Sequence, residues 1–237
     1  MKLVFIFVFS LSSLISYSQI NLLKKVSEQA ESLINTEVKL SEQDIADGLI
    51  ETLISGSSYS ANLASSEGGF NNSIIRIPFP DEAIKIKTSL LQIGFKSKIE
   101  EFENCINKAA ETASEKAFLI LLESIREMSI EDVFTILNGE DNAATVYLKN
   151  DTYEFLYSEF KPIIFSAMQK VDVAKTWNPL IEKYNTIPFI QKINPDLEDY
   201  ITTKTIEGLF ILISQQEKEI RTNPEARVSE LLQKVFK

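Results

Sequence analysis

Apolar residues recur at intervals of three and four along most of this chain of 237 residues. Because an α-helix turns once in about 3.6 residues, this spacing gathers the apolar side chains on one face of a helix. The chain has only seven glycines and seven prolines, and most of them stand where such runs stop or start. The sequence therefore predicts an all-α fold, a single irregular multi-helix bundle of about eight to ten helices.

Two neighbouring segments show this rhythm most clearly. Residues 83–93 form one apolar stripe that is followed by Gly94, and residues 99–113 form the next stripe. Glycine just after a helix favours the left-handed conformation that ends it. We therefore expect two helices that pack side by side as an antiparallel hairpin.

A long helix is predicted near the C-terminus. The Asn-Pro-Asp sequence at 194–196 combines a capping residue, a proline at the first helical position and an acid in the first turn, and the helix should run to Arg221. Within it, Leu209–Ile213 is apolar on every side and should be buried all round, with Gly208 letting a neighbouring helix approach. Upstream, the Ser- and Gly-rich stretch Gly56–Gly69 is expected to form a loop.

Residues 75–80 break the helical pattern. Their two prolines lack backbone N–H groups and disfavour a helical conformation in the residue before each of them. The segment should therefore be an extended strap whose alternate side chains point the same way. We expect Ile75, Ile77 and Phe79 to insert between helices and Arg76 to point away from them.

The strap is the candidate interaction segment of the chain. Arg76, one of four arginines, stands between its apolar residues. A guanidinium group in this setting can clamp a carboxylate on a nearby helix, or it can contact an anionic group of a ligand. The sequence leaves both roles open, and the residues concerned are Ile75, Arg76, Ile77 and Phe79.

The N-terminus has the order of a secretory signal. Lys2 precedes an apolar stretch from Leu3 to Ile15, and small residues follow at positions 16 and 18. The apolar stretch is shorter than the ~20 residues needed to span hydrocarbon, and no basic stop-transfer cluster follows it. We expect residues 1–18 to be a cleaved signal peptide and residues 19–237 to form a single helical domain. The cleaved protein would be exported and would not be an integral membrane protein.

Charge and cysteine content narrow the function further. The chain carries 34 acidic and 24 basic side chains, a net charge of −10. Such a surface repels phosphate backbones and anionic lipid head groups, so nucleic acid is not expected as a partner. The single cysteine, Cys105, cannot form an internal disulfide, and we expect its thiol to be buried and inert.

The residues needed for common catalytic and metal sites are missing or unsuitably spaced. The chain has no histidine, which removes the commonest general base and zinc ligand. The acids among residues 196–199 are explained by the dipole of a helix N-terminus, and the oxygen ligands of residues 138–142 lack the spacing of a calcium loop. We therefore predict no catalytic residues, no metal site and no cofactor, and an enzyme is the least expected class.

Several short motifs resemble one bacterial family. In chain order they are Arg76–Pro80, Leu137–Thr145, Asn194–Tyr200 and Glu217–Pro224. Together they resemble the DUF4197 family of exported bacterial proteins, over about residues 49–236. The resemblance implies export to the periplasm or cell envelope of a bacterium. Because the family has no established activity, it implies no catalytic residues.

Two binding functions remain. The first is a cell-envelope interaction or scaffold module that meets an envelope protein through its acidic helical surface or the strap. The alternative is a carrier of an apolar small molecule or lipid in a cavity between helices. Aromatic residues within 143–171 suggest the carrier, although such residues can equally form an ordinary core. They are Tyr147, Tyr153, Phe155, Tyr157, Phe160 and Phe165.

Overall fold

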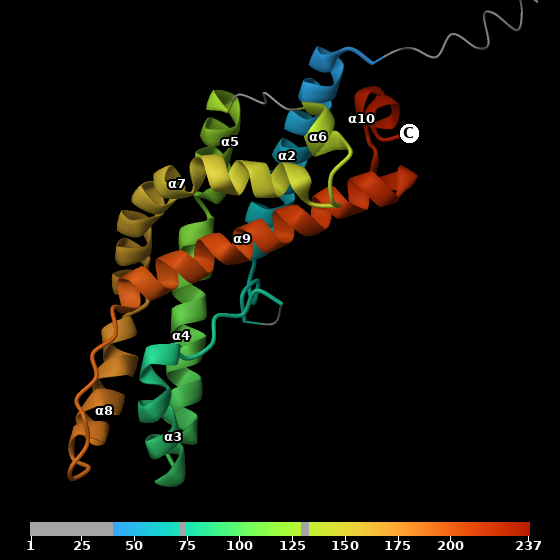
Figure 1. The fold of residues 1–237 in the computed structure, drawn as a ribbon. Helices are drawn as coiled ribbons and strands as arrows, with labels where there is room; N and C mark the ends of the chain where they lie inside the picture. Colours follow the sequence, from blue (N-terminus) through green and yellow to red (C-terminus); the bar gives the residue numbers. More distant parts are fainter. Residues whose placement is uncertain (1–39, 72–73, 129–132) are drawn as a thin grey trace, which may run out of the picture. The chain divides into compact units, whose positions relative to one another are not determined.

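The structure, a computed structural model, describes residues 40–71, 74–128 and 133–237. Within these ranges the chain forms nine α-helices and two 3-10 turns, and it has no strand (Figure 1). The predicted all-α multi-helix bundle is confirmed. The elements are α2 (Glu42–Ser65), η1 (Asp81–Ala83), α3 (Ile84–Gln92), α4 (Lys96–Ser114), α5 (Ala117–Glu127), α6 (Val133–Leu137), α7 (Ala143–Lys170), α8 (Val173–Asn185), α9 (Leu197–Thr222), η2 (Pro224–Ala226) and α10 (Glu230–Val235).

All of these helices belong to one compact unit, Glu42–Lys237. The predicted signal peptide, residues 1–18, lies outside the described residues, as does the start of the predicted domain at residue 19. Both therefore stay predictions. None of the described helices combines the length and the apolarity that a membrane crossing requires.

Helix α9 packs closely against α2 because small residues of α2 face it. A Cβ atom added at Gly56 would lie 3.0 Å from Cγ2 of Ile213. The Ser60 hydroxyl donates a hydrogen bond of 2.9 Å to the carbonyl oxygen of Leu209. The predicted loop at Gly56–Gly69 is therefore wrong up to Ser65, where α2 ends, and right for the turns at residues 66–69. Packing against α9 offsets the low helix propensity of glycine and serine in α2.

Helix α9 begins two residues later than predicted and is not buried on every side. Asp196 is its cap, and the Asp196 carboxylate accepts a hydrogen bond from the backbone N–H of Asp199. Four residues of the apolar stretch Leu209–Ile213 are buried as expected. Ile211 is 43% exposed, so the prediction of burial on every side is wrong at this position. Gly208 admits the strap rather than a helix, because an added Cβ would lie 3.1 Å from Cβ of Ile75.

A buried ion pair on α9 fixes the turn between α6 and α7. The Glu217 carboxylate accepts hydrogen bonds from the backbone N–H groups of Ala144 and Thr145, at 3.0 and 2.7 Å. Arg221 donates to Glu217 at 2.8 Å and to the carbonyl oxygen of Leu137 at 2.8 Å. One acid and one base on α9 therefore satisfy the free N–H groups that begin α7 and a free carbonyl that ends α6.

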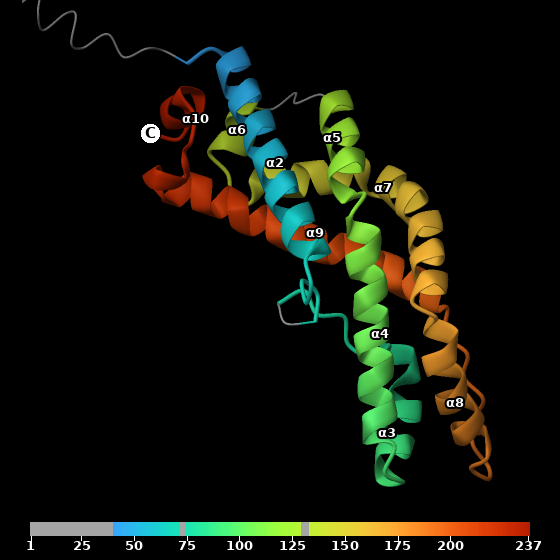
Figure 2. The same cartoon turned by 180° about the vertical axis from the view of Figure 1, so that it is seen from behind.

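The predicted hairpin of α3 and α4 is confirmed. Gly94 has a φ of +83° in the turn between the two helices, a conformation that glycine adopts without strain. Helix α8 packs against both α3 and α4. The α3–α4 turn and the loop after α8 therefore lie at the same end of the helical unit (Figures 1 and 2).

Candidate functional site

The strap is held to α4 by one asparagine. The side chain of Asn107 accepts a hydrogen bond from the Ile77 backbone N–H and donates one to the Ile77 carbonyl oxygen, both at 2.8 Å. Asn107 is fully buried, and both polar groups of the Ile77 backbone are satisfied as they would be in a strand pair. The side chain of Asn107 therefore replaces the helical hydrogen bonds that the prolines prevent.

The apolar side chains of the strap point into the core. Ile75, Ile77 and Phe79 are all buried, which confirms the predicted orientation. The ring of Phe79 lies 5.2 Å from that of Phe102 and 5.7 Å from that of Trp177, measured between centroids. This aromatic cluster joins the strap to α4 and α8.

Arg76 points away from the core and forms an ion pair with a carboxylate, as the structural alternative predicts. Its guanidinium group lies 3.2 Å from the Glu103 carboxylate, which Lys87 also approaches to 2.6 Å. The Arg76 side chain is 37% exposed and that of Glu103 only 11%. The ion pair thus lies on the solvent-exposed side of the strap. Contact of the strap with a partner stays a prediction.

Sequence reasoning missed the polar row on α4 that holds this segment. Glu103, Asn107 and Glu111 follow one another at intervals of four and lie on one helix face. Glu111 accepts a hydrogen bond of 3.4 Å from the backbone N–H of Phe70, just before the strap. The sequence did contain a sign of this row, because these polar residues recur at a helical spacing beside the apolar side of α4.

The outer side of the strap forms one wall of a hollow against α9. The hollow has a volume of about 200 Å³, and strap residues Ile75, Arg76 and Ile77 line it. Phe79 does not line it, because its ring lies in the aromatic cluster. The opposite wall comes from α9 and includes Lys204, Glu207, Gly208 and Ile211.

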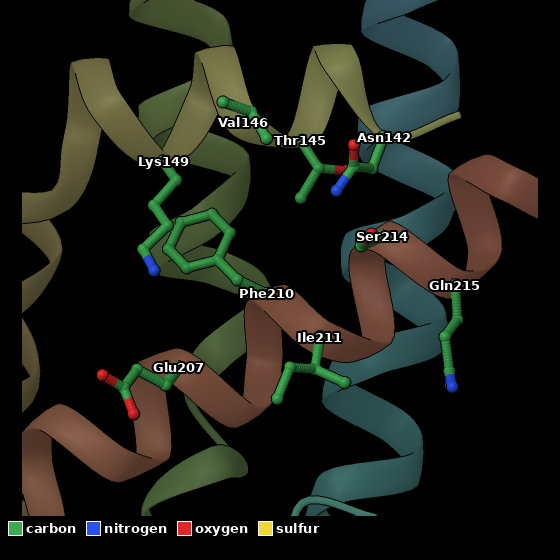
Figure 3. Close-up of a pocket in the computed structure, with 9 residues that line it drawn as sticks. All are labelled: Asn142, Thr145, Val146, Lys149, Glu207, Phe210, Ile211, Ser214 and Gln215. Carbon is green, nitrogen blue, oxygen red and sulfur yellow. The ribbon is translucent and has the colours of Figure 1, made fainter. Parts of the chain in front are cut away.

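A second hollow of about 450 Å³ lies between α7 and α9 (Figure 3). Val146 and Ile211 supply exposed apolar surface, and the Lys149 ammonium lies 5.9 Å from the centre of the Phe210 ring. Polar side chains gather at the other end of the hollow (Figure 3). They are Asn142, Thr145, Ser214 and Gln215.

A third hollow, of about 270 Å³, lies at the N-terminal end of α9 and is rich in acids. Tyr200 lines it and donates a hydrogen bond of 3.1 Å to the Pro78 carbonyl oxygen. Burial, helped by the charge of Asp81 and two other carboxylates, raises the pKa of Tyr200 to about 12. The acids that line this hollow are Asp81, Glu82, Asp196 and Asp199.

These three hollows share lining residues and are therefore neighbours along α9. The first and third share Asp81 and Lys204, and the first and second share Glu207 and Ile211. We call this surface the α9 groove. From residue 199 to residue 215 it follows α9 for about 24 Å at the helical rise.

Exposed apolar side chains line the α9 groove between its charged residues. Ile74 is 64% exposed, Val146 46% and Ile211 43%, and each belongs to a different segment of the chain. No group of three or more acidic, cysteine or histidine residues in the described ranges could hold a metal ion.

One comparison with known proteins decides the family. The sequence model of DUF4197, described as a protein of unknown function, matches residues 39–237. The chain belongs to the DUF4197 family. No curated protein and no solved structure matches the chain.

The segments that resemble DUF4197 in sequence meet in pairs in this structure. The Tyr200 hydroxyl bonds to Pro78, which joins the third motif to the first. Arg221 bonds to Leu137, which joins the fourth motif to the second. In this DUF4197 chain the motifs therefore hold α9 against the strap and the α6–α7 turn, and both of those segments border the α9 groove.

The aromatic residues that suggested a carrier are dispersed in this DUF4197 chain. Phe160 is fully buried, whereas Phe155 and Phe165 are exposed. None of the six aromatic residues lines the three hollows of the α9 groove. The carrier hypothesis therefore receives no support from them.

Cys105 differs from the prediction of full burial. It is half-buried, and its Sγ atom lies 3.3 Å from the carbonyl oxygen of Val171, as a hydrogen-bond donor. Burial is the main cause that raises the pKa of this thiol above its ordinary value. A raised pKa keeps the thiol protonated and therefore less reactive.

The anchoring of the strap can be tested by mutation. Asn107→Leu leaves two buried polar groups of the Ile77 backbone without partners, and we expect it to lower the free energy of unfolding by about 2–4 kcal/mol. Arg76→Ala removes a partly exposed ion pair and should cost about 1 kcal/mol or less. Urea unfolding followed by circular dichroism measures both. A larger loss for Arg76→Ala would mean that the contacts of Arg76 with Glu103 and Asn71, and not Asn107, hold the strap.

Tyr200 should make the stability of the protein depend on pH in alkaline solution. The folded protein holds the phenol proton to about pH 12, against an ordinary pKa of 10.0, so the unfolded chain releases it first. The stabilising contribution is complete below pH 10 and is lost as pH rises through 12. Urea unfolding at stepped pH should show wild type losing more stability over this window than Tyr200→Phe. Parallel curves for the two proteins would contradict this origin.

Proposed function

We propose that this DUF4197 protein is a non-enzymatic interaction module of the cell envelope. Its ligand would be a short polypeptide segment of a partner protein, bound in the α9 groove. The observation that carries the proposal is the row of three neighbouring hollows along α9, whose lining includes exposed Ile74, Val146 and Ile211. Exposed apolar residues gathered in a groove with a polar rim are typical of a protein-binding surface.

The dimensions of the groove favour a polypeptide over a compact small molecule. Small-molecule sites enclose most of the surface of their ligand, whereas these hollows open to solvent along α9. A groove of about 24 Å matches about seven residues of an extended peptide at ~3.3 Å each. Apolar side chains of such a peptide would contact Ile211 and its neighbours.

The charge of the groove favours a basic residue at one end of that peptide. Asp81 and Glu82 are exposed beside the third hollow. Lys204, the only basic residue lining this hollow, pairs with Glu207 at 2.8 Å, so it does not neutralise these two acids. A lysine or arginine on the ligand would complement them.

Location in the envelope rests on the N-terminal sequence. Lys2, the short apolar stretch after it and the small residues at 16 and 18 support export and removal of residues 1–18. The intact mass of the exported protein should then correspond to a chain that begins at Gln19. A chain in the envelope fraction that still begins at Met1 would contradict cleavage.

The groove can be tested with peptides selected from a random library displayed on phage. Selected peptides should combine apolar residues with a lysine or arginine at one end. Ile211→Asp replaces an exposed apolar side chain of the groove by a charge and should weaken their binding about tenfold or more, as measured by fluorescence anisotropy. Asp81→Lys should weaken it about fivefold, because it reverses the charge at the acidic end.

The matched control is Leu119→Asp on α5. Leu119 is also an exposed apolar residue, but it lines none of the three hollows, so binding should not change. Equal binding by wild type and Ile211→Asp would overturn the proposal. Native mass spectrometry of protein purified from its own envelope tests the carrier alternative, which requires a retained apolar small molecule or lipid.

A further inference from the structure

A second surface lies at the end formed by the α3–α4 turn and the α8–α9 loop. We call residues 91–98 and 183–193 together the tip. The two segments are in contact, because the Lys183 ammonium lies 5.9 Å from the centre of the Phe95 ring. Both reach the same end of the helical unit in two opposite views (Figures 1 and 2).

The tip exposes large apolar side chains. Leu91, Ile93 and Phe189 are exposed, and Phe189 is as accessible as in an extended chain. Phe189 also has a φ of 60°, a left-handed conformation that is costly for a bulky residue. Four further apolar residues of the tip are only half-buried: Phe95, Ile187, Ile190 and Ile193.

The tip is basic, in contrast to the chain as a whole. Its two segments contain four lysines and no acid, within a chain of net charge −10. Lys96 and Lys98 pair with Glu100 and Glu101 in the next turn of α4, at 3.6 and 2.7 Å. Glu182 is the acid that precedes the second segment. The other two lysines of the tip, Lys183 and Lys192, are exposed.

We infer that the tip binds a membrane surface that carries anionic lipids. Phe189, Ile93 and Leu91 enter the boundary between head groups and acyl chains, and the lysines contact the phosphates. This combination of apolar and basic side chains is the one by which peripheral proteins bind such surfaces. Long lysine side chains can also reach head groups while their methylene groups remain in the apolar layer.

The geometry favours a lipid surface over an acidic protein partner. The apolar side chains project from two chain reversals and line none of the three hollows of the α9 groove. A protein partner would need matching pockets for them, whereas a fluid lipid layer adapts to projecting side chains.

The net acidity of the chain does not prevent this contact. At physiological salt, charges further apart than about 8 Å are largely screened, so the local charge of the tip decides the encounter. Acidic surface elsewhere is repelled by the same lipids and orients the protein with its tip toward the membrane. The inference does not depend on the α9 groove, because the two surfaces share no residue.

Sedimentation with lipid vesicles tests the tip. The full chain without its predicted signal peptide should bind vesicles of equal parts phosphatidylglycerol and phosphatidylcholine, and should bind pure phosphatidylcholine much less. Added salt should weaken the binding. Phe189→Ser should lower the partition coefficient between vesicles and water about tenfold. Lys183→Gln and Lys192→Gln, made as separate variants, should each lower this partition coefficient about fivefold.

Two variants on other helices serve as matched controls. Phe134→Ser on α6 removes an exposed phenylalanine, and Lys234→Gln on α10 removes an exposed lysine. Both should bind vesicles as wild type does. Failure of wild type to bind anionic vesicles would overturn the inference, as would equal losses in the tip variants and the controls. Circular dichroism melts, unchanged in the tip variants, would confirm that the loss is not caused by unfolding.

Discussion

The position of α9 depends on small residues where other segments approach it. Gly56 and Ser60 let α9 lie close to α2, and Gly208 lets the strap lie close to α9. Cβ atoms added at the two glycines would lie 3.0 Å from Ile213 and 3.1 Å from Ile75, so these neighbours would have to shift. These contacts fix the position of α9 against α2 and the strap. The α9 groove is the part of the α9 surface that stays exposed between the strap and α7.

Local patterns predicted much of the fold. Apolar periodicity gave the helical class and the α3–α4 hairpin, and the prolines gave the strap with its buried Ile75 and Ile77. The loop predicted at Gly56–Gly69 failed up to Ser65 because packing against residues about 150 positions away, which local sequence cannot show, stabilises that part of α2. The α9 groove could not be predicted either, since its walls come from distant segments and an apolar run does not reveal which side stays uncovered.

The net charge of the chain also failed to predict the local charge of one surface, the tip. A net charge of −10 predicts repulsion from anionic lipids, yet the tip contains four lysines and no acid. Net charge averages over the surface, whereas screening limits each encounter to nearby charges. The lysines of the tip were visible in the sequence, but only the packing of α8 against α3 and α4 shows that they lie at one end.

The hydrogen bonds that anchor α9 also constrain the order in which the chain can fold. Ser60 bonds across 149 positions, Tyr200 across 122 and Glu217 across 73. Ser60, Pro78 and Ala144 therefore lack these hydrogen-bond partners until the last quarter of the chain has been synthesised. Contacts of such long range slow folding, because each must close a large loop. For a chain that is exported as proposed, the α9 contacts would form only after most of the chain has been synthesised, and a secretion channel passes chains that have not completed their fold.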